Sequence, residues 1–258
     1  MVLNNLLILS YDGSSFYGWQ KQPDFPTVQG EVERVLSILF NDKIRVIGAG
    51  RTDRGVHALR QYANFYSPCV FGASFLKKSL NSLLPPEIRV LKVITGVNPA
   101  FNARKHAIWR EYKYFIYSGE VLPPFLHRYC YHLKRKIDVS IITDLTDVLI
   151  GTHDFSAFCD GEEKTKSKIR TIYRCSFEKK GNLFVFTIRA NSFLRHMVRV
   201  MLATLIDIAS GKREKELFIK ALSSGDRTLC SAALPPQGLW LWRVGFPTEV
   251  YAGAVFSK

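Results

Sequence analysis

The sequence predicts an α+β protein made of two similar sheet-and-helix halves that join edge to edge. The first observation is the order of strand and helix patterns up to residue 100, which is βαββαβ, the split βαβ motif. The second is a looser repeat of that order in residues 101–258. The third is the segment Leu183–Ala190, in which most residues on both faces of the strand are apolar. Such a strand suits the centre of a sheet that is covered on both sides. Because no linker rich in glycine and serine separates the halves, we expect one functional unit with a central cleft as its site.

The first half reads as four strands and two helices. Thr27 is a suitable N-cap for a helix that runs to Phe40, with apolar residues every three or four positions along one stripe. A second helix is expected over Ala73–Leu84, because Pro85 and Pro86 cannot continue it. Strand patterns occupy residues 5–12, 45–47, 61–67 and 88–94.

The second half begins with a strand at 110–117, followed by an insertion at 123–136 rich in proline, histidine and arginine. Gly181 and Asn182 predict a hairpin turn between strands at 169–178 and 183–190. A helix is expected from about Asn191 to Gly211, where glycine ends it. Further helices are predicted at 139–150 and 214–222, and a last strand at 239–244.

Composition points to a globular protein with a polyanionic partner. Hydrophobic residues make up 47% of the 258 residues and charged residues 22%, which argues against a disordered chain. Lys and Arg number 36 against 22 Asp and Glu, a formal net charge of +14. Cations that displace counterions from phosphates supply nucleic-acid affinity. A basic surface without a partner is the alternative, and charge alone does not choose between them. The same choice is open for the basic residues of 123–136 and 164–170, which are RNA contacts or solvated loops.

Location and metal binding follow from what the sequence lacks. The first ten residues have no basic region and too short an apolar run for a secretory signal. No apolar stretch approaches the ~20 residues that span a membrane. The five cysteines form no C-x-x-C pair, so we expect buried, reduced thiols in a cytoplasmic protein. His127, Cys130 and His132 lack a second ligand cluster, and no P-loop is present, so we expect neither a metal nor a cofactor.

The densest polar segment is the loop Gly48–Ala58, in which three glycines frame one carboxylate, Asp53, between Arg51 and Arg54. Asp-x-Gly is a common turn, and such a turn with two solvated arginines is one interpretation. The functional interpretation makes Asp53 a nucleophile whose anion the guanidinium groups stabilise, while an arginine contacts phosphate or a displaced base. No second carboxylate lies nearby in sequence, so the loop is not by itself a two-carboxylate glycosidase site.

Two further segments combine aromatic or basic residues in a regular pattern. Tyr112 and Tyr114 share one face of a strand; they are either core residues or a stacking and proton-transfer surface for a flipped base. Arg195 and Arg199 share a helix face; they are either solvated or bind phosphate or a carboxylate.

Together these segments resemble the tRNA pseudouridine synthase A family. The loop matches the family signature G-R-T-D-x-G-V-H-A at Gly50–Ala58. Several ordered matches spanning nearly the whole chain are far more specific than any single one. The other matching segments are Tyr11-Asp12-Gly13, Gly18-Trp19-Gln20, Phe101–Arg104, Arg110–Tyr114, Asn191–Arg199 and Gly238–Leu241.

The resemblance implies two ferredoxin-like halves about a pseudo-twofold axis and a role for each matching residue. Asp53 aligns with the catalytic aspartate, and Arg51 with an arginine that helps to displace the target base. Tyr112 aligns with the tyrosine that lies against the uracil, Arg199 with the arginine that pairs with the catalytic carboxylate, and Leu239 with an apolar residue of the pocket. The resemblance also implies a homodimer acting on tRNA at positions 38, 39 and 40 of the anticodon stem-loop.

Two positions depart from the family pattern. Arg54 replaces the alanine that usually follows the aspartate, and its charge either strengthens RNA contact or alters the geometry of the loop. Val200 stands where asparagine is common after the helix arginine. For the reaction, Asp53 either attacks C1′ or abstracts the 2′ proton, and Tyr112 positions the uracil and is a candidate for removing the C5 proton. The competing hypotheses are an RNA-binding module without chemistry and a hydrolase that releases free base.

Overall fold

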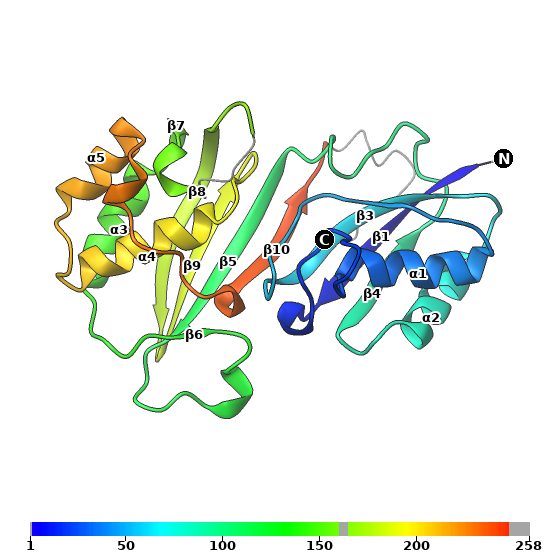
Figure 1. Ribbon diagram of the computed structural model, residues 1–258, viewed down its shortest axis with the longest axis horizontal. Helices are drawn as coiled ribbons and strands as arrows, with labels where there is room; N and C mark the ends of the chain where they lie inside the picture. Colours follow the sequence, from blue (N-terminus) through cyan, green and yellow to red (C-terminus); the bar gives the residue numbers. More distant parts are fainter. Residues whose placement is uncertain (1, 160–164, 248–258) are drawn as a thin grey trace. The chain divides into compact units, whose positions relative to one another are not determined.

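The computed structural model describes residues 2–159 and 165–247, in which the chain forms two compact units (Figure 1). Among the described residues, the first unit contains 2–109 together with 241–247, and the second lies within Arg110–Trp240. The last strand is therefore divided between the two. The functional halves 1–100 and 101–258 suggested by the sequence remain a prediction.

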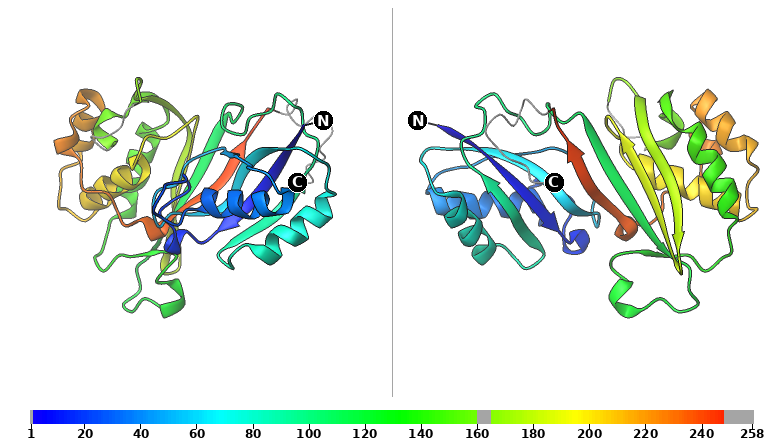
Figure 2. Two further views of the ribbon diagram at one scale, coloured as in Figure 1. Left: turned by 45° about the vertical axis from the view of Figure 1, so that its right-hand side comes forward. Right: turned by 180° about the vertical axis from the view of Figure 1, so that it is seen from behind.

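The first unit is built on antiparallel strands. β1 (Leu3–Tyr11) lies between β3 (His57–Ser67) and β4 (Ile88–Ile94), in a register that sets Leu7 opposite Ala63 and Val93. The short β2 (Val46–Gly48) pairs with residues 63–65 of β3. In the order of strands, β3 lies between β1 and β10 (Leu239–Gly245). Helices α1 (Val28–Phe40) and α2 (Ala73–Leu83) cover one face of these strands (Figures 1 and 2).

Local sequence explains where α1 begins and ends. The Thr27 hydroxyl accepts a hydrogen bond from the Gly30 amide, and Asn41 ends the helix in the left-handed conformation with φ 48°. Several apolar side chains of α1 and of β1 are fully buried and belong to the core of this unit. The order β1-α1-β2-β3-α2-β4 confirms the predicted βαββαβ sequence of elements.

The second unit has its own strands and its own helices. Strand β9 (Leu183–Ala190) pairs antiparallel with β5 (Trp109–Tyr117) on one side and β8 (Ile169–Lys180) on the other, which makes it central as predicted. Gly181, with φ 60°, allows the predicted β8–β9 hairpin turn. β7 (Gly151–Asp154) lies beside β8 at the end of the strand order, and the two-residue β6 (Tyr131–His132) pairs with β5 outside that order. The helices are α3 (Val139–Val148), α4 (Met197–Ala209) and α5 (Glu216–Ser224).

The start of α4 corrects the sequence prediction. The helix begins at Met197 rather than near Asn191, because His196 adopts the left-handed conformation with φ 61°. The Asn191 side chain also accepts hydrogen bonds from the Thr171 and Ser192 amides, which holds residues 191–192 against β8 instead of in a helix. Strands β6 and β7 were not predicted, since two and four residues are too few to show a period.

The structure confirms the α+β class: the described residues form ten strands, paired mostly antiparallel, and five α-helices. All five cysteines are free, and four of them are buried. Cys69 is exposed, which corrects the expectation that every thiol is buried, because it lies in the turn region after β3. None of the described helices has the length and apolar character needed to cross a membrane.

Candidate active site

Asp53 lies on a loop between β2 and β3 whose backbone is held at several points. The Ala49 amide donates to the Tyr62 carbonyl at 2.7 Å, and the Gln61 side chain donates to the Gly50 carbonyl at 2.7 Å. The Asp53 carbonyl accepts from the Val56 amide at 3.1 Å, across a turn in which Gly55 has φ 77°. The loop is therefore fixed to β3 before the carboxylate and closed by a turn after it.

The segment after β1 packs against the other side of this loop. The Trp19 amide donates to the Thr52 carbonyl at 3.0 Å, next to Asp53 in sequence. Gly18 has φ 87°, and a Cβ built there would lie 2.6 Å from the Thr52 carbonyl oxygen. A Cβ on Gly13 would lie 2.0 Å from the Val56 carbonyl oxygen. Only glycine permits this approach, which explains why two glycine motifs accompany the Asp53 loop in sequence.

A buried hydroxyl pair anchors the residue before Asp53. The Tyr11 hydroxyl lies 2.8 Å from the Thr52 hydroxyl, and both side chains are buried. Burial raises the pKa of the Tyr11 hydroxyl well above its ordinary value, so it stays protonated. On the far side of the turn, the Gly13 amide donates to Nδ1 of the buried His57 at 3.0 Å. Sequence reasoning did not single out Tyr11, Thr52 or His57, although each lies inside a motif it quoted.

The loop presents its charged side chains outward. Thr52 is buried, Asp53 is half-buried, and Arg51 and Arg54 are exposed. The Arg54 guanidinium does not extend free into solvent, because it lies 4.0 Å from the centroid of the Tyr17 ring. The carboxylate is thus partly accessible on a loop held by hydrogen bonds, and its function remains a prediction.

In the second unit the two tyrosines of β5 have different environments. Tyr112 is 7% exposed and its ring meets Phe193 edge to face, with centroids 5.0 Å apart. Tyr114 is fully buried, and its hydroxyl donates to the Pro235 carbonyl at 2.7 Å. Burial raises the pKa of the Tyr114 hydroxyl far above its ordinary value. Tyr114 is therefore a core residue, and its stacking interpretation is wrong. Phe193 was missed as a neighbour of Tyr112, because nothing in its spacing indicates the contact.

Arg199, near the start of α4, forms hydrogen bonds with the backbone of Leu234. Its Nε donates to the Leu234 carbonyl at 2.6 Å, and the Leu234 amide donates to the Arg199 carbonyl at 3.2 Å. Its positive charge acts on the neighbouring Tyr114 hydroxyl, where it partly opposes the effect of burial on the pKa. Arg195 is exposed, so the two arginines that share a face in sequence differ in environment. Leu239, 6% exposed, begins β10.

The predicted site residues thus come from both units. Asp53 and Arg51 belong to the first, and Tyr112, Arg199 and Leu239 to the second. No group of three or more metal-binding side chains occurs in the ranges 2–159 and 165–247.

The basic segments left open by the sequence contain inward-facing arginines. Arg170 is 8% exposed and donates to the Ser167 and Ile169 carbonyls, and Arg135 pairs with Asp207. Both guanidinium groups therefore have partners within the protein. Lys164 lies outside the described residues.

Comparison with known proteins gives one consistent result. The family model described as tRNA pseudouridine synthase matches residues 7–96 and 146–247. A protein from Oceanobacillus iheyensis named tRNA pseudouridine synthase A is 41% identical over 240 residues, 92% of this chain and 94% of that protein. A protein of the same name from Brachyspira hyodysenteriae is 38% identical over 250 residues, 96% of this chain and 100% of that protein. A solved structure, the crystal structure of a Cbf5-Nop10-Gar1 complex, is 11% identical with a TM-score of 0.33 over 78% of this chain and 44% of that chain, too slight a likeness to carry an argument.

Proposed function

Because the chain belongs to the tRNA pseudouridine synthase family, we propose that it converts uridine to pseudouridine in tRNA with Asp53 as the nucleophile. Family membership makes the chain an isomerase that acts on uridine in tRNA. The role of Asp53 is supported by the observation that carries the proposal: a half-buried carboxylate on a loop whose flanking residues are fixed by hydrogen bonds. A fixed carboxylate loses little freedom in the transition state, which is how enzymes gain rate from positioning.

The reaction needs few groups. The N1–C1′ bond breaks, the uracil turns, a C5–C1′ bond forms, and the C5 proton passes to a base while N1 gains a proton. Nothing is oxidised and no group leaves, so we propose that neither a metal nor a cofactor takes part. Asp53 either attacks C1′ to give a covalent intermediate or removes the 2′ proton to give a glycal. In both routes the carboxylate must be ionised at the start.

We assign the remaining roles by residue. Tyr112 lies against the uracil and is the candidate for the C5 proton, and its edge contact with Phe193 fixes the ring. Arg199 balances the charge of Asp53, and its bond to the Leu234 carbonyl orients the guanidinium. Leu239 supplies an apolar surface for the free base. Arg51 is exposed beside Asp53 and helps to displace the target base from its stack, which costs a few kcal/mol.

The remaining parts of the proposal concern the partner and the assembly. We propose uridines 38, 39 and 40 of the anticodon stem-loop as targets, a homodimer as the active form, and the cytoplasm as the location. The net charge of +14 supports a tRNA partner, since each phosphate contact releases counterions. Light scattering with and without tRNA measures the oligomeric state directly.

The deciding experiment follows the fate of the base. Unmodified tRNA carrying tritium at C5 of uridine is incubated with the chain, digested and separated. Pseudouridine with release of tritium to water is the expected result. Free uracil would indicate a hydrolase, and intact uridine with tight tRNA binding would indicate an RNA-binding module without chemistry. Mapping the modified positions then tests the anticodon stem-loop assignment.

A further inference from the structure

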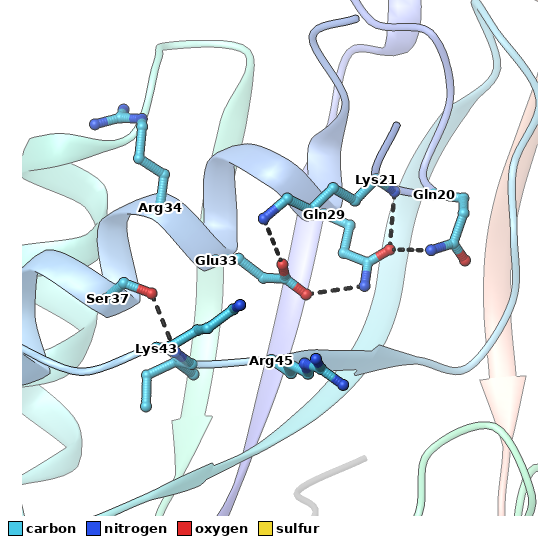
Figure 3. A pocket seen from close by; sticks show the side chains of 9 residues that line it. Gln20, Lys21, Gln29, Glu33, Arg34, Ser37, Lys43 and Arg45 are labelled. Atoms are coloured by element: carbon cyan, nitrogen blue, oxygen red, sulfur yellow. Dashed lines mark hydrogen bonds and ion pairs between the residues drawn. The ribbon is translucent and has the colours of Figure 1, made fainter. Parts of the chain in front are cut away.

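A polar pocket of about 360 Å³ lies in the first unit, between α1 and the segment that leads into β2 (Figure 3). Four cationic side chains and one carboxylate line it, together with amide and hydroxyl groups. Nothing in the proposed reaction uses this pocket. Its lining consists of Gln20, Lys21, Gln29, Glu33, Arg34, Ser37, Lys43, Ile44 and Arg45.

The one carboxylate of the pocket is already satisfied. The Glu33 side chain is 7% exposed and accepts hydrogen bonds from Lys21 Nζ at 3.1 Å, from the Gln29 amide at 3.0 Å and from the Val46 backbone at 3.0 Å. A buried carboxylate with three donors is fixed and neutralised in place. Arg34 pairs with Glu31 at 2.8 Å and points away from the other side chains (Figure 3).

Lys43 and Arg45 lie on the other side of the pocket, on the segment that leads into β2. Lys43 and Arg45 are exposed, and within the described part of the chain no ion pair involves either side chain. Lys43 extends toward the Glu33 carboxylate, whose oxygens are already occupied by Lys21 and Gln29 (Figure 3). Cations brought together without counter-charges create a positive potential that attracts an anion.

A fixed amide completes the set. Gln29 uses both its amide hydrogens, on Glu33 and the Val46 carbonyl, and its oxygen accepts from the Gln20 side chain at 2.8 Å and the Lys21 amide at 3.0 Å. Gln29 is therefore saturated and holds Gln20 in place. The Gln20 side chain retains a second N–H and its carbonyl oxygen for a ligand. Cations with an oriented amide donor are the usual contacts to a nucleic-acid phosphate.

The pocket is connected to the Asp53 loop through a single residue. Trp19 precedes Gln20, and its amide donates to the Thr52 carbonyl next to Asp53, while its carbonyl accepts from the Gln29 amide at 3.0 Å. We propose that Lys43, Arg45 and Gln20 bind a phosphodiester of the RNA strand that carries the target uridine. This inference rests on the proposed function, since it takes tRNA as the substrate, and it makes the pocket a positioning subsite.

The test compares two charge-matched double variants by measuring affinity for an unmodified tRNA transcript over a salt series. Lys43→Ala/Arg45→Ala removes the two pocket cations. Lys77→Ala/Lys78→Ala removes two exposed cations of α2 that lie outside the pocket. We expect the pocket variant to bind roughly tenfold more weakly near ~0.1 M salt, with its log–log salt slope reduced by about 2. The control pair should change both quantities much less, and its kcat at saturating tRNA should equal that of the wild type.

Equal losses in the two variants would overturn the subsite, because they would reflect net charge alone. A second arm titrates inorganic phosphate and follows thermal unfolding. If phosphate stabilised the wild type but not the pocket variant, and both bound tRNA with equal affinity, the pocket would bind a small anion instead of the RNA. Pseudouridine formation by the wild type is measured in the same samples. A wild type that binds tRNA without converting it would end the proposed reaction but leave the binding comparison intact.

Discussion

The Arg54 guanidinium lies 4.0 Å from the centroid of the Tyr17 ring, and Tyr17 stacks on Phe25 with ring centroids 4.3 Å apart. Arg54 is the residue at which this chain departs from the family pattern after the aspartate. The contact ties the Asp53 loop to the segment after β1 through side chains, in addition to the backbone bonds of Trp19 and Gly55. The Arg54 side chain therefore has an aromatic partner on that segment.

Replacing Arg54 with alanine should lower the free energy of unfolding by about 0.5–1 kcal/mol, the value of a cation–π contact at an exposed site. Urea denaturation measures the change. Arg54→Lys keeps the charge but not the planar group, so it should recover only part of the loss. Wild-type stability in Arg54→Ala would show that the stack contributes nothing.

Replacing Asp53 with asparagine should lower pseudouridine formation by roughly 10⁴-fold or more, because the amide cannot serve as a nucleophile or base. Affinity for tRNA should stay within several-fold, since the carboxylate makes no favourable contact with phosphate. Tritium release and a binding assay give the two quantities. Asp24→Asn, an exposed carboxylate on the loop before α1, is the matched control and should retain full activity. Full pseudouridine yield from Asp53→Asn would end the nucleophile assignment.

The two tyrosines of β5 offer a matched pair of variants. Tyr112→Phe should bind tRNA normally and turn over slowly if the phenol takes part in proton transfer. Tyr114→Phe loses the hydrogen bond to the Pro235 carbonyl and should lower the unfolding free energy by about 1 kcal/mol, with kcat unchanged. Single-turnover kinetics and urea denaturation separate the two effects. An unchanged rate in Tyr112→Phe would leave that ring only a stacking role.

Stability should fall at high pH. Burial raises the pKa of the Tyr11 and Tyr114 hydroxyls and of the Cys175 thiol above their ordinary values. The folded state therefore keeps these protons, while the unfolded chain releases them above about pH 8.5 to 10. Their contribution to the free energy of unfolding is complete below that range and is lost as the pH rises. In Tyr11→Phe one such group is gone, and the decline above about pH 10 should be shallower by up to about 1.4 kcal/mol per pH unit. An identical slope would mean that Tyr11 is not protected in the folded state.

Sequence patterns predicted most elements because their signals are local. Thr27 and the spacing of apolar residues in α1 predict where this helix begins and ends. Gly181 predicts the turn between β8 and β9. The start of α4 was wrong because the left-handed His196 and the side-chain bonds of Asn191 depend on tertiary contacts. Short strands such as β7 carry no periodic signal at all.

The candidate site was only partly accessible to such reasoning. Asp53 stands out because a carboxylate between arginines in a glycine-framed loop is unusual. The hydroxyl pair of Tyr11 and Thr52 joins residues far apart in sequence, and only β1–β3 pairing brings them together. The same holds for the pocket, where Glu33 on α1 is buried although a glutamate on a helix is ordinarily exposed.

The division of β10 between the units has a consequence for synthesis on the ribosome. Strand β3, which leaves the Asp53 loop, has β10 as a neighbour, yet the β10 residues from Leu241 on follow the whole second unit in the chain. Until they emerge, the stretch of that β3 edge that does not pair with β2 stays open, and open edges invite wrong pairing between nascent chains. The unit that bears Asp53 is therefore the first to be translated and the last to be completed.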